Sequence, residues 1–241
     1  MITINTVLIS GSSRGIGLAC ATKFLKEGWK VVINGGHDKK ALDEACYMLA
    51  KKYSFVMAHF ADVSCYRQAE ELFMAAERQF GQVDVLINNA GMSYLGLFNT
   101  MPAETWDDIV RANLNSVFNC SHLALQNMVA NKKGAIVNIS SVWGCRGASN
   151  EVVYSAAKGG VNSFTKALAK ELAPSNIRVN AISCGVIDTV MNAGFCAEEL
   201  RQSIPMGRLG TPDEVADVAF FLASERAGYI TGQIIGIDGG F

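Results

Sequence analysis

The sequence predicts an α/β protein built on a single doubly wound, parallel sheet of about seven strands flanked by helices. Short, solidly apolar runs alternate with longer amphipathic segments along all 241 residues. Runs that are apolar throughout are typical of strands buried on both faces of a parallel sheet. A regular alternation of such strands with helical segments favours one α/β domain spanning residues 1–241.

The expected elements follow one another in order along the chain. The expected strands are TVLIS (6–10), KVVIN (30–34), SFVMAHF (54–60), VDVLINN (83–89), GAIVNIS (134–140), IRVNAIS (177–183) and QIIGID (233–238). The helical spacings are found at 15–28, 38–52, 64–80, 104–131, 152–173 and 212–224. Gly28 and Gly81 fit helix C-termini, while Thr211 and Pro212 fit an N-cap and a first helical position.

One segment, 186–208, has weaker periodicity than its neighbours. We expect it to form a mobile lid over a substrate pocket, because binding loops are commonly drawn from such connections. A surface excursion with a short helix fits the same pattern.

The composition argues against several classes of function. The formal net charge is −1, and no block of like charges suggests nucleic-acid binding or a membrane surface. The seven cysteines include no C-x-x-C pair and the three histidines lie far apart, so no metal site is expected. Scattered thiols, no signal-peptide pattern and no apolar stretch of membrane-spanning length predict a reduced, cytoplasmic protein.

A glycine-rich loop, SGSSRGIG, joins the first strand to the first helix. Gly11, Gly15 and Gly17 let the backbone turn tightly and approach a pyrophosphate, and the N-terminus of the next helix favours an anion. Because the spacing is not the standard G-x-G-x-x-G, a turn that serves packing alone remains the alternative. The strand–loop–helix setting favours a dinucleotide cofactor.

The end of the second strand bears on the choice of cofactor. Enzymes that use NAD commonly place a carboxylate there to hold the ribose 2′-hydroxyl. This strand instead ends in Asn34 and Gly35, and Asp38 fits the cap of the following helix. NADP(H) is therefore favoured, while NAD(H) stays possible if Asp38 turns inward. The nearby cationic candidates for a 2′-phosphate are Arg14, His37, Lys39 and Lys40.

The segment SVWGCRGASNEVVYSAAKGG carries the candidate chemistry. Tyr154 and Lys158, four residues apart, share one face of a helix, and Ser141 ends the preceding strand. Tyrosine has an ordinary pKa of about 10, and a nearby ammonium should lower it. Such a phenol can give its proton to a carbonyl oxygen. The alternative is a solvent-exposed helix with an unrelated serine.

In their order and spacing these motifs resemble those of the short-chain dehydrogenase/reductase family, over essentially the whole chain. The matching segments are SGSSRGIG (10–17), ADVS (61–64), NNAG (88–91), Asn113 in RANLNSVF, Ser141, YSAAK (154–158) and ITGQIIGIDGG (230–240). The resemblance implies a Rossmann-like fold, a homotetramer, and a catalytic set of Asn113, Ser141, Tyr154 and Lys158. Cys184-Gly185 departs from the Pro-Gly that is common in the family, which predicts a local change in that turn.

The loop and the resemblance together give a set of expected cofactor-binding residues. Asn88 would brace the central sheet beside them, and no metal ligand is implied. The set consists of Gly11, Ser13, Arg14, Gly15, Ile16, Gly17, Asn34, Gly35, His37, Asp62, Val63, Asn89, Ala90, Gly91, Tyr154, Lys158, Gly185, Ile187 and Thr189.

Within the family the chain is most similar to bacterial 3-oxoacyl-[acyl-carrier-protein] reductases. This implies NADPH-dependent reduction of a 3-oxoacyl thioester to the 3-hydroxyacyl product in fatty-acid synthesis. Lys132, Lys133, Lys166 and Lys170 are candidate contacts for an acidic carrier protein, although ELAPSN (171–176) has no arginine. The alternatives are a dehydrogenase of another secondary alcohol (a hydroxysteroid, a sugar or polyol, or a 3-hydroxyacyl-CoA) and an NADP(H)-sensing binding protein without turnover.

Overall fold

The computed structural model describes residues 5–192 and 197–241. Its sheet has seven strands, all parallel, in the order β3-β2-β1-β4-β5-β6-β7. The strands are β1 (Thr6–Ile9), β2 (Lys30–Gly35), β3 (Val56–Phe60), β4 (Val85–Asn88), β5 (Gly134–Ser141), β6 (Ile177–Cys184) and β7 (Ile234–Ile237). The predicted fold class is confirmed.

The strand order reverses direction between β1 and β4. From β1 the chain moves outward to β3, then crosses back to β4 and continues to β7 at the other edge. In open parallel sheets, ligands bind beyond the carboxyl ends of the strands at such a switch point. The topology therefore places any site at the ends of β1, β4, β5 and β6.

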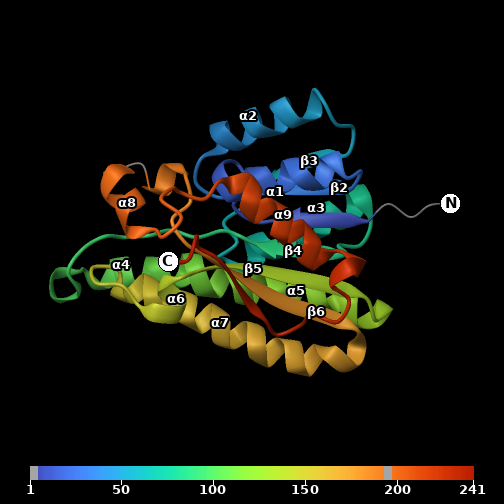
Figure 1. Cartoon of the computed structure of the whole chain (residues 1–241). Coiled ribbons are helices and arrows are strands. Elements are labelled where there is room, and N and C mark those ends of the chain that lie inside the picture. Colours follow the sequence, from blue (N-terminus) through green and yellow to red (C-terminus); the bar gives the residue numbers. More distant parts are fainter. Residues whose placement is uncertain (1–4, 193–196) are drawn as a thin grey trace.

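Helices cover both faces of the sheet, and each layer has its own apolar core (Figure 1). One core joins the sheet to α1 (Gly15–Lys26), α2 (Lys39–Ala50) and α9 (Pro212–Ala223). The other joins it to α3 (Tyr66–Phe80), α5 (Ser116–Asn131) and α7 (Val152–Leu172). Alternate residues of each strand enter opposite cores, as Val7 and Leu8 do, which explains why the strands are apolar throughout.

The predicted helical segment at 104–131 is confirmed, but it contains a π-helical turn that the spacing did not predict. The structure divides it into α4 (Ala103–Val110), a π-helical turn (Arg111–Asn115) and α5. The side chain of Asn113 donates to the carbonyl of Ile109 at 2.9 Å, in competition with the helical N–H donors. Such π turns commonly mark functional positions.

The predicted helix starts are confirmed where side chains cap them. Asp38 caps α2 by accepting from the N–H of Ala41 at 3.0 Å. Thr211 and Glu214 form a reciprocal capping box at α9, with Pro212 in its first turn. Each bond satisfies an N–H group that a helix start leaves without a partner.

The predicted lid is only partly within the described chain. Residues 193–196 lie outside it, and on either side are a short 3-10 turn (Val190–Asn192) and α8 (Ala197–Ser203). The segment is attached to the body by a parallel bridge between Ile187 and Gly210. Its mobility stays a prediction. A further short helix, α6 (Trp143–Arg146), follows β5.

Among the helices of the described chain, none combines the length and apolar character that crossing a membrane requires.

Candidate active site

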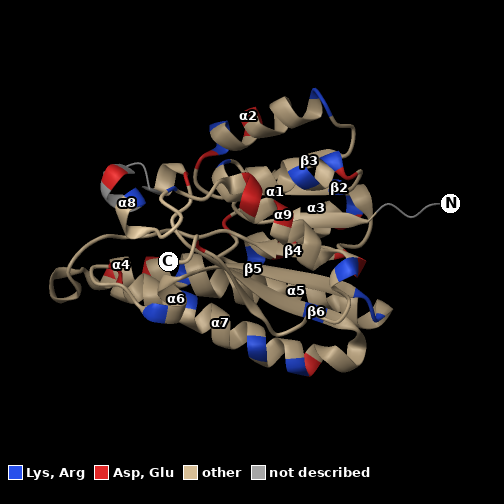
Figure 2. Ribbon diagram, in the orientation of Figure 1, with Lys and Arg blue, Asp and Glu red and all other residues tan. Residues whose placement is uncertain are grey.

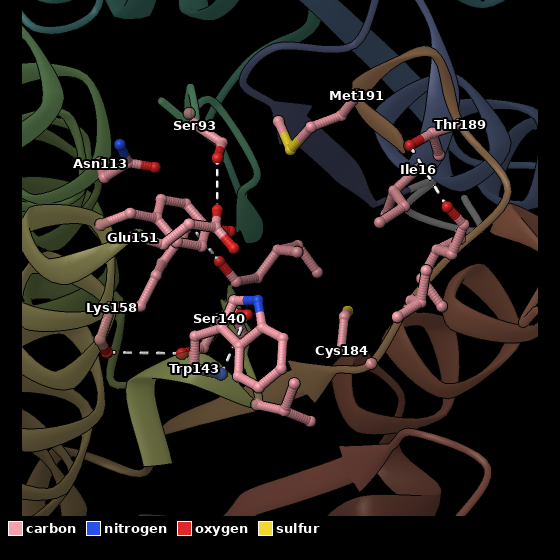
Figure 3. A pocket seen from close by; sticks show the side chains of 18 of the residues that line it. Ile16, Ser93, Asn113, Ser140, Trp143, Glu151, Lys158, Cys184, Thr189 and Met191 are labelled. Carbon is pink, nitrogen blue, oxygen red and sulfur yellow. Dashed lines mark hydrogen bonds between the residues drawn. The ribbon is translucent and has the colours of Figure 1, made fainter. Parts of the chain in front are cut away.

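A cavity of about 190 Å³ lies beyond the carboxyl ends of the central strands (Figure 3). It brings together ten of the predicted site residues: Ile16, Asn89, Gly91, Asn113, Ser141, Tyr154, Lys158, Gly185, Ile187 and Thr189. The remaining wall residues are Ser93, Ile139, Ser140, Val142, Trp143, Glu151, Cys184, Val186 and Met191. Residues that are far apart in sequence therefore share one concave site, as binding pockets require.

Tyr154 and Lys158 project from the first turns of α7 into this cavity. Both are buried, with 9% and 4% of their surface exposed. The Lys158 Nζ atom lies 5.7 Å from the centre of the Tyr154 ring and donates to the carbonyl of Ile139 at 2.9 Å. Gly144 permits this packing, because a Cβ atom there would lie 2.7 Å from the Lys158 backbone. The predicted pairing of phenol and ammonium is thus present in space.

The pKa of Tyr154 differs from the sequence-based expectation. Burial raises the pKa of the phenol above its ordinary value, and this outweighs a hydrogen bond with Ser141 that lowers it. Burial also lowers the pKa of Lys158 to about 8. The expectation that Lys158 makes the phenol more acidic is therefore wrong for the chain by itself, because desolvation disfavours both charged forms.

The hydroxyl of Ser141 is oriented by its own backbone turn. The N–H of Trp143 donates to the Ser141 Oγ at 3.2 Å. Because that oxygen already accepts a hydrogen bond, its proton is left to point toward the phenol or another oxygen in the cavity. Ser141 is thus arranged as a donor beside Tyr154.

Asn113 is fully buried behind Lys158. Its Nδ2 atom donates to the carbonyls of Met92 and Ile109, at 2.7 and 2.9 Å. Its Oδ1 atom has no hydrogen-bond partner in the described chain. A Cβ atom on Gly91 would lie 2.5 Å from that oxygen and 3.5 Å from the Lys158 Nζ. A buried acceptor of this kind calls for a donor in the same space.

The glycine loop forms a cradle next to the cavity. Gly11 and Gly15 have φ angles of +60° and +56°, which favour glycine. A Cβ atom on Gly17 would lie 2.5 Å from the carbonyl of Gly11. Asn89 stabilises the turn by donating to that same carbonyl at 2.7 Å.

The helix that follows is also open to an anion. No acidic residue lies in the first turn of α1, and its N-cap residue, Arg14, makes no side-chain capping bond. The first N–H groups of the helix therefore lack side-chain acceptors, which is the arrangement that binds phosphate groups. The loop and helix fit the pyrophosphate of a dinucleotide.

The corner beyond β2 is cationic. Asp38 is committed to capping α2, so the inward turn that would favour NAD is not observed. Lys39 pairs with Asp43 at 2.6 Å, whereas Arg14 makes no ion pair within the described chain. His37 is exposed beside it. Arg14 is thus the cation here that no carboxylate of the described chain neutralises.

Asn34 has a different role from the one expected. Its side chain is 1% exposed and accepts from the N–H of Gly11 at 3.3 Å. It also donates to the carbonyls of His59 and Ala61, at 3.2 and 2.9 Å. Its amide therefore joins the glycine loop to β2 and β3, and it braces the cradle instead of presenting a donor to a ligand.

The other predicted cofactor residues surround this cradle outside the cavity. Asp62 and Val63 follow β3, where the Asp62 carboxylate accepts from the N–H of Ser64 at 2.9 Å. Gly36 packs against this segment, because a Cβ atom there would lie 2.9 Å from the carbonyl of Ala61. The cradle group comprises Gly11, Ser13, Arg14, Gly15, Gly17, Gly35, His37, Asp62, Val63 and Ala90.

The lysines that are candidate contacts for a carrier protein do not line the cavity. Figure 2 shows basic residues along α7. Lys132 and Lys133 precede β5, whereas Ser141 ends it. A strand rise of about 3.3 Å per residue puts roughly 25 Å between them. Lys166 and Lys170 lie on exposed positions two to three turns beyond Lys158 in α7.

Sequence reasoning missed several wall residues. Glu151 lies three residues before Tyr154, so helical spacing alone could have placed it on the same face. Ser93 and Met191 lie outside regular helices and strands, where no periodicity locates a side chain. Trp143 enters the cavity through α6, a helix too short to give a periodic signal.

The sequence is similar to those of known proteins over almost its whole length. A family model described as enoyl-(acyl carrier protein) reductase matches residues 11–241. A 3-oxoacyl-[acyl-carrier-protein] reductase of Aquifex aeolicus is 42% identical, over 97% of this chain and 95% of that relative. The corresponding reductase of Thermotoga maritima is 40% identical, over 97% and 96%. An uncharacterized oxidoreductase of Bacillus subtilis is 39% identical, over 98% of both chains.

Proposed function

The chain belongs to the short-chain dehydrogenase/reductase family of oxidoreductases that act on CH–OH and C=O groups, and on this basis we propose that it reduces 3-oxoacyl-[acyl-carrier-protein] to the 3-hydroxyacyl form with NADPH. The observation that carries the proposal is the convergence of Ser141, Tyr154 and Lys158 on one cavity beside the glycine cradle. The names of the curated relatives favour this substrate.

Each residue of the site has its own role in the reduction of the carbonyl. The nicotinamide cofactor, held by the glycine cradle, supplies the hydride. Ser141 donates a hydrogen bond to the carbonyl oxygen, which stabilises negative charge there. Tyr154 gives its proton to the same oxygen, and its raised pKa keeps that proton in place near neutrality.

Lys158 and Asn113 assist the proton transfer from the phenol of Tyr154. The ammonium of Lys158, with a pKa of about 8, is mostly protonated at neutral pH. It binds the ribose hydroxyls and supplies a positive charge near Tyr154. The unpartnered Oδ1 of Asn113 would accept from a water that also hydrogen-bonds to Lys158. That water would link the catalytic lysine to the π-helical turn.

The preference for NADPH rests on charge at the corner beyond β2. A 2′-phosphate carries negative charge that an uncompensated guanidinium binds well. Arg14 is the cation in that position, with His37 exposed beside it. Because the Asp38 carboxylate caps α2, it is not directed at the phosphate.

An acidic carrier protein would approach through the mouth of the cavity. Arg146 is an exposed cation at the end of α6, and its guanidinium lies 6.0 Å from the ring of Phe241. Phe241 in turn packs edge-on against Trp143 of the cavity wall, at 5.3 Å. Arg146 thus replaces the distant lysines as the proposed contact for the carrier.

We also propose that the protein is a homotetramer, with α5 and α7 at its interface. Phe118 is 40% exposed and packs against Phe164 with ring centres 4.9 Å apart. This aromatic pair on the outer side of the two long helices suits burial against a second copy. Leu123 and Leu168 are already buried in the sheet core.

A substrate panel with both cofactors tests the proposal. We expect the purified protein to oxidise NADPH with acetoacetyl-[acyl-carrier-protein] at a kcat/KM at least about tenfold above that for hydroxysteroid or sugar ketones. Initial rates at 340 nm measure this. Preference for another ketone would identify a different substrate class, and bound NADPH without turnover on any ketone would indicate a sensor.

A further inference from the structure

Glu151 places a carboxylate in the wall of the catalytic cavity, one helical turn before Tyr154. It occupies the N-cap position of α7 but makes no side-chain bond to the first turn of that helix. Instead its Oε1 atom accepts from the hydroxyl of Ser93 at 2.5 Å (Figure 3). The side chain is thus directed across the cavity wall and away from the ordinary capping role of its position.

The backbone on both sides fixes this pair. The N–H of Gly96 donates to the carbonyl of Asn150 at 2.9 Å, which attaches the loop after β4 to the start of α7. The N–H of Ser155 donates to the carbonyl of Glu151 at 2.8 Å. Glu151 and Ser93 are therefore held on segments that are bonded to each other.

The charge of Glu151 is left without a cation. Within the described chain it forms no ion pair, and Ser93 donates the one side-chain hydrogen bond that its carboxylate accepts. Trp143, Val142 and Met191 make the neighbouring wall apolar. Glu151 is itself partly exposed, so water screens its charge in part, but the charge still acts on a group that enters the cavity.

The electric field of the Glu151 carboxylate reaches the hydroxyl of Tyr154. Alongside burial and the thiol of Cys184, the charge of Glu151 raises the pKa of Tyr154. The hydroxyl of Ser141 acts in the opposite direction. A substrate oxygen bound to Tyr154 therefore lies within the electrostatic range of Glu151.

We propose that Glu151 is a specificity residue that excludes 3-oxoacids bearing a free carboxylate and restricts the site to uncharged 3-oxoacyl esters and thioesters. This inference rests on the proposed function. A free 3-oxoacid carries its negative charge two carbons from the ketone, whereas the thioester is neutral at that carbon. Two like charges in one small cavity repel, which is a way of rejecting a wrong partner.

A matched pair of substrates tests the inference. Acetoacetate and ethyl acetoacetate share the ketone and differ in charge, and the measured quantity is the ester-to-acid ratio of kcat/KM with NADPH. We expect Glu151→Gln to lower this ratio at least about tenfold, because it removes the charge and nearly keeps the shape. Glu225→Gln, an exposed site after α9, makes the same change of charge outside the cavity and should leave the ratio unaltered.

A second readout is the pH dependence of reduction. Removing the negative charge should lower the pKa of Tyr154, so the alkaline limb of kcat/KM for the ester should shift to lower pH in Glu151→Gln. Because burial also sets the pKa of Tyr154, a shift of this limb supports a charge effect of Glu151 only together with a lower ester-to-acid ratio. Should circular dichroism reveal that Glu151→Gln is unfolded, both measurements are made on Glu151→Ala, which removes the same charge.

The possible results distinguish the specificity role of Glu151 from the proposed function. If the protein reduces both substrates and neither the ratio nor the alkaline limb changes in the variant, the specificity role is overturned and the proposed function stands. If the parent protein reduces neither acetoacetyl-[acyl-carrier-protein] nor ethyl acetoacetate, the proposed function is wrong, and the specificity role of Glu151 is wrong with it.

Discussion

Tyr154→Phe is expected to lower kcat for ketone reduction by about 10²- to 10⁴-fold, the range that a positioned proton donor contributes. The phenol is the acidic group directed at the carbonyl oxygen in this cavity, and phenylalanine keeps its shape without its proton. Ser141 and the bound cofactor remain in place, so we expect a residual rate above that without protein. The measurement is NADPH oxidation with an acetoacetyl thioester.

The cofactor affinity of this variant should stay within a fewfold of that of the parent, because the glycine cradle is untouched. Titration of NADPH fluorescence measures it. Tyr229→Phe is a suitable control, since Tyr229 is fully exposed at the surface. Near-parental turnover in Tyr154→Phe would refute the assignment of the proton donor.

Arg14→Ala should weaken NADPH binding by about 10- to 100-fold, because one charge-assisted contact with a phosphate contributes about 1.5–3 kcal/mol. NADH lacks the 2′-phosphate, so its dissociation constant should change no more than about twofold. Arg14 also lies next to the pyrophosphate cradle, and the comparison of the two cofactors separates these roles. Both dissociation constants are measured by titration.

Lys26→Ala provides the matched control. Lys26 ends the same helix, α1, on an exposed position away from the cradle. Its loss removes one positive charge from the protein without touching the site. Equal losses of affinity for NADPH and NADH in Arg14→Ala would contradict a role in binding the 2′-phosphate.

The sheet was predictable because most of its strands are buried on both faces and are therefore largely apolar. All seven runs were located, with ends that differ by a few residues, and the caps at Asp38 and Thr211 were found from local chemistry alone. The π turn was not predictable from periodicity. A single amide, on Asn113, bonds to the backbone of Ile109 and competes with the helical ladder there.

The site was predictable where function sets the spacing within one element, as for Tyr154 and Lys158. It was less predictable where tertiary contacts decide. Asn34 lies where a cofactor contact was expected, but its amide is saturated by backbone groups of β3 and the glycine loop. Ser93 reaches Glu151 through a loop that carries no periodic signal.

Electrostatics could not be read from the spacing of Tyr154 and Lys158. The sequence suggested that an ammonium one turn away makes the phenol acidic. Burial instead raises the pKa of Tyr154 and lowers that of Lys158, because both side chains leave water. A positive charge bound in the cavity would lower the pKa of Tyr154, and the oxidised nicotinamide ring would carry such a charge.

A spectroscopic titration of Tyr154 measures how the charge of the bound cofactor changes the pKa of the phenol. The absorbance of tyrosinate is followed against pH in the complexes with NADP⁺ and with NADPH, and the signal of Tyr154→Phe is subtracted to isolate this residue. We predict that Tyr154 ionises at a clearly lower pH in the NADP⁺ complex than in the NADPH complex. Ionisation at the same pH in both complexes, or at a lower pH with NADPH, would contradict the account.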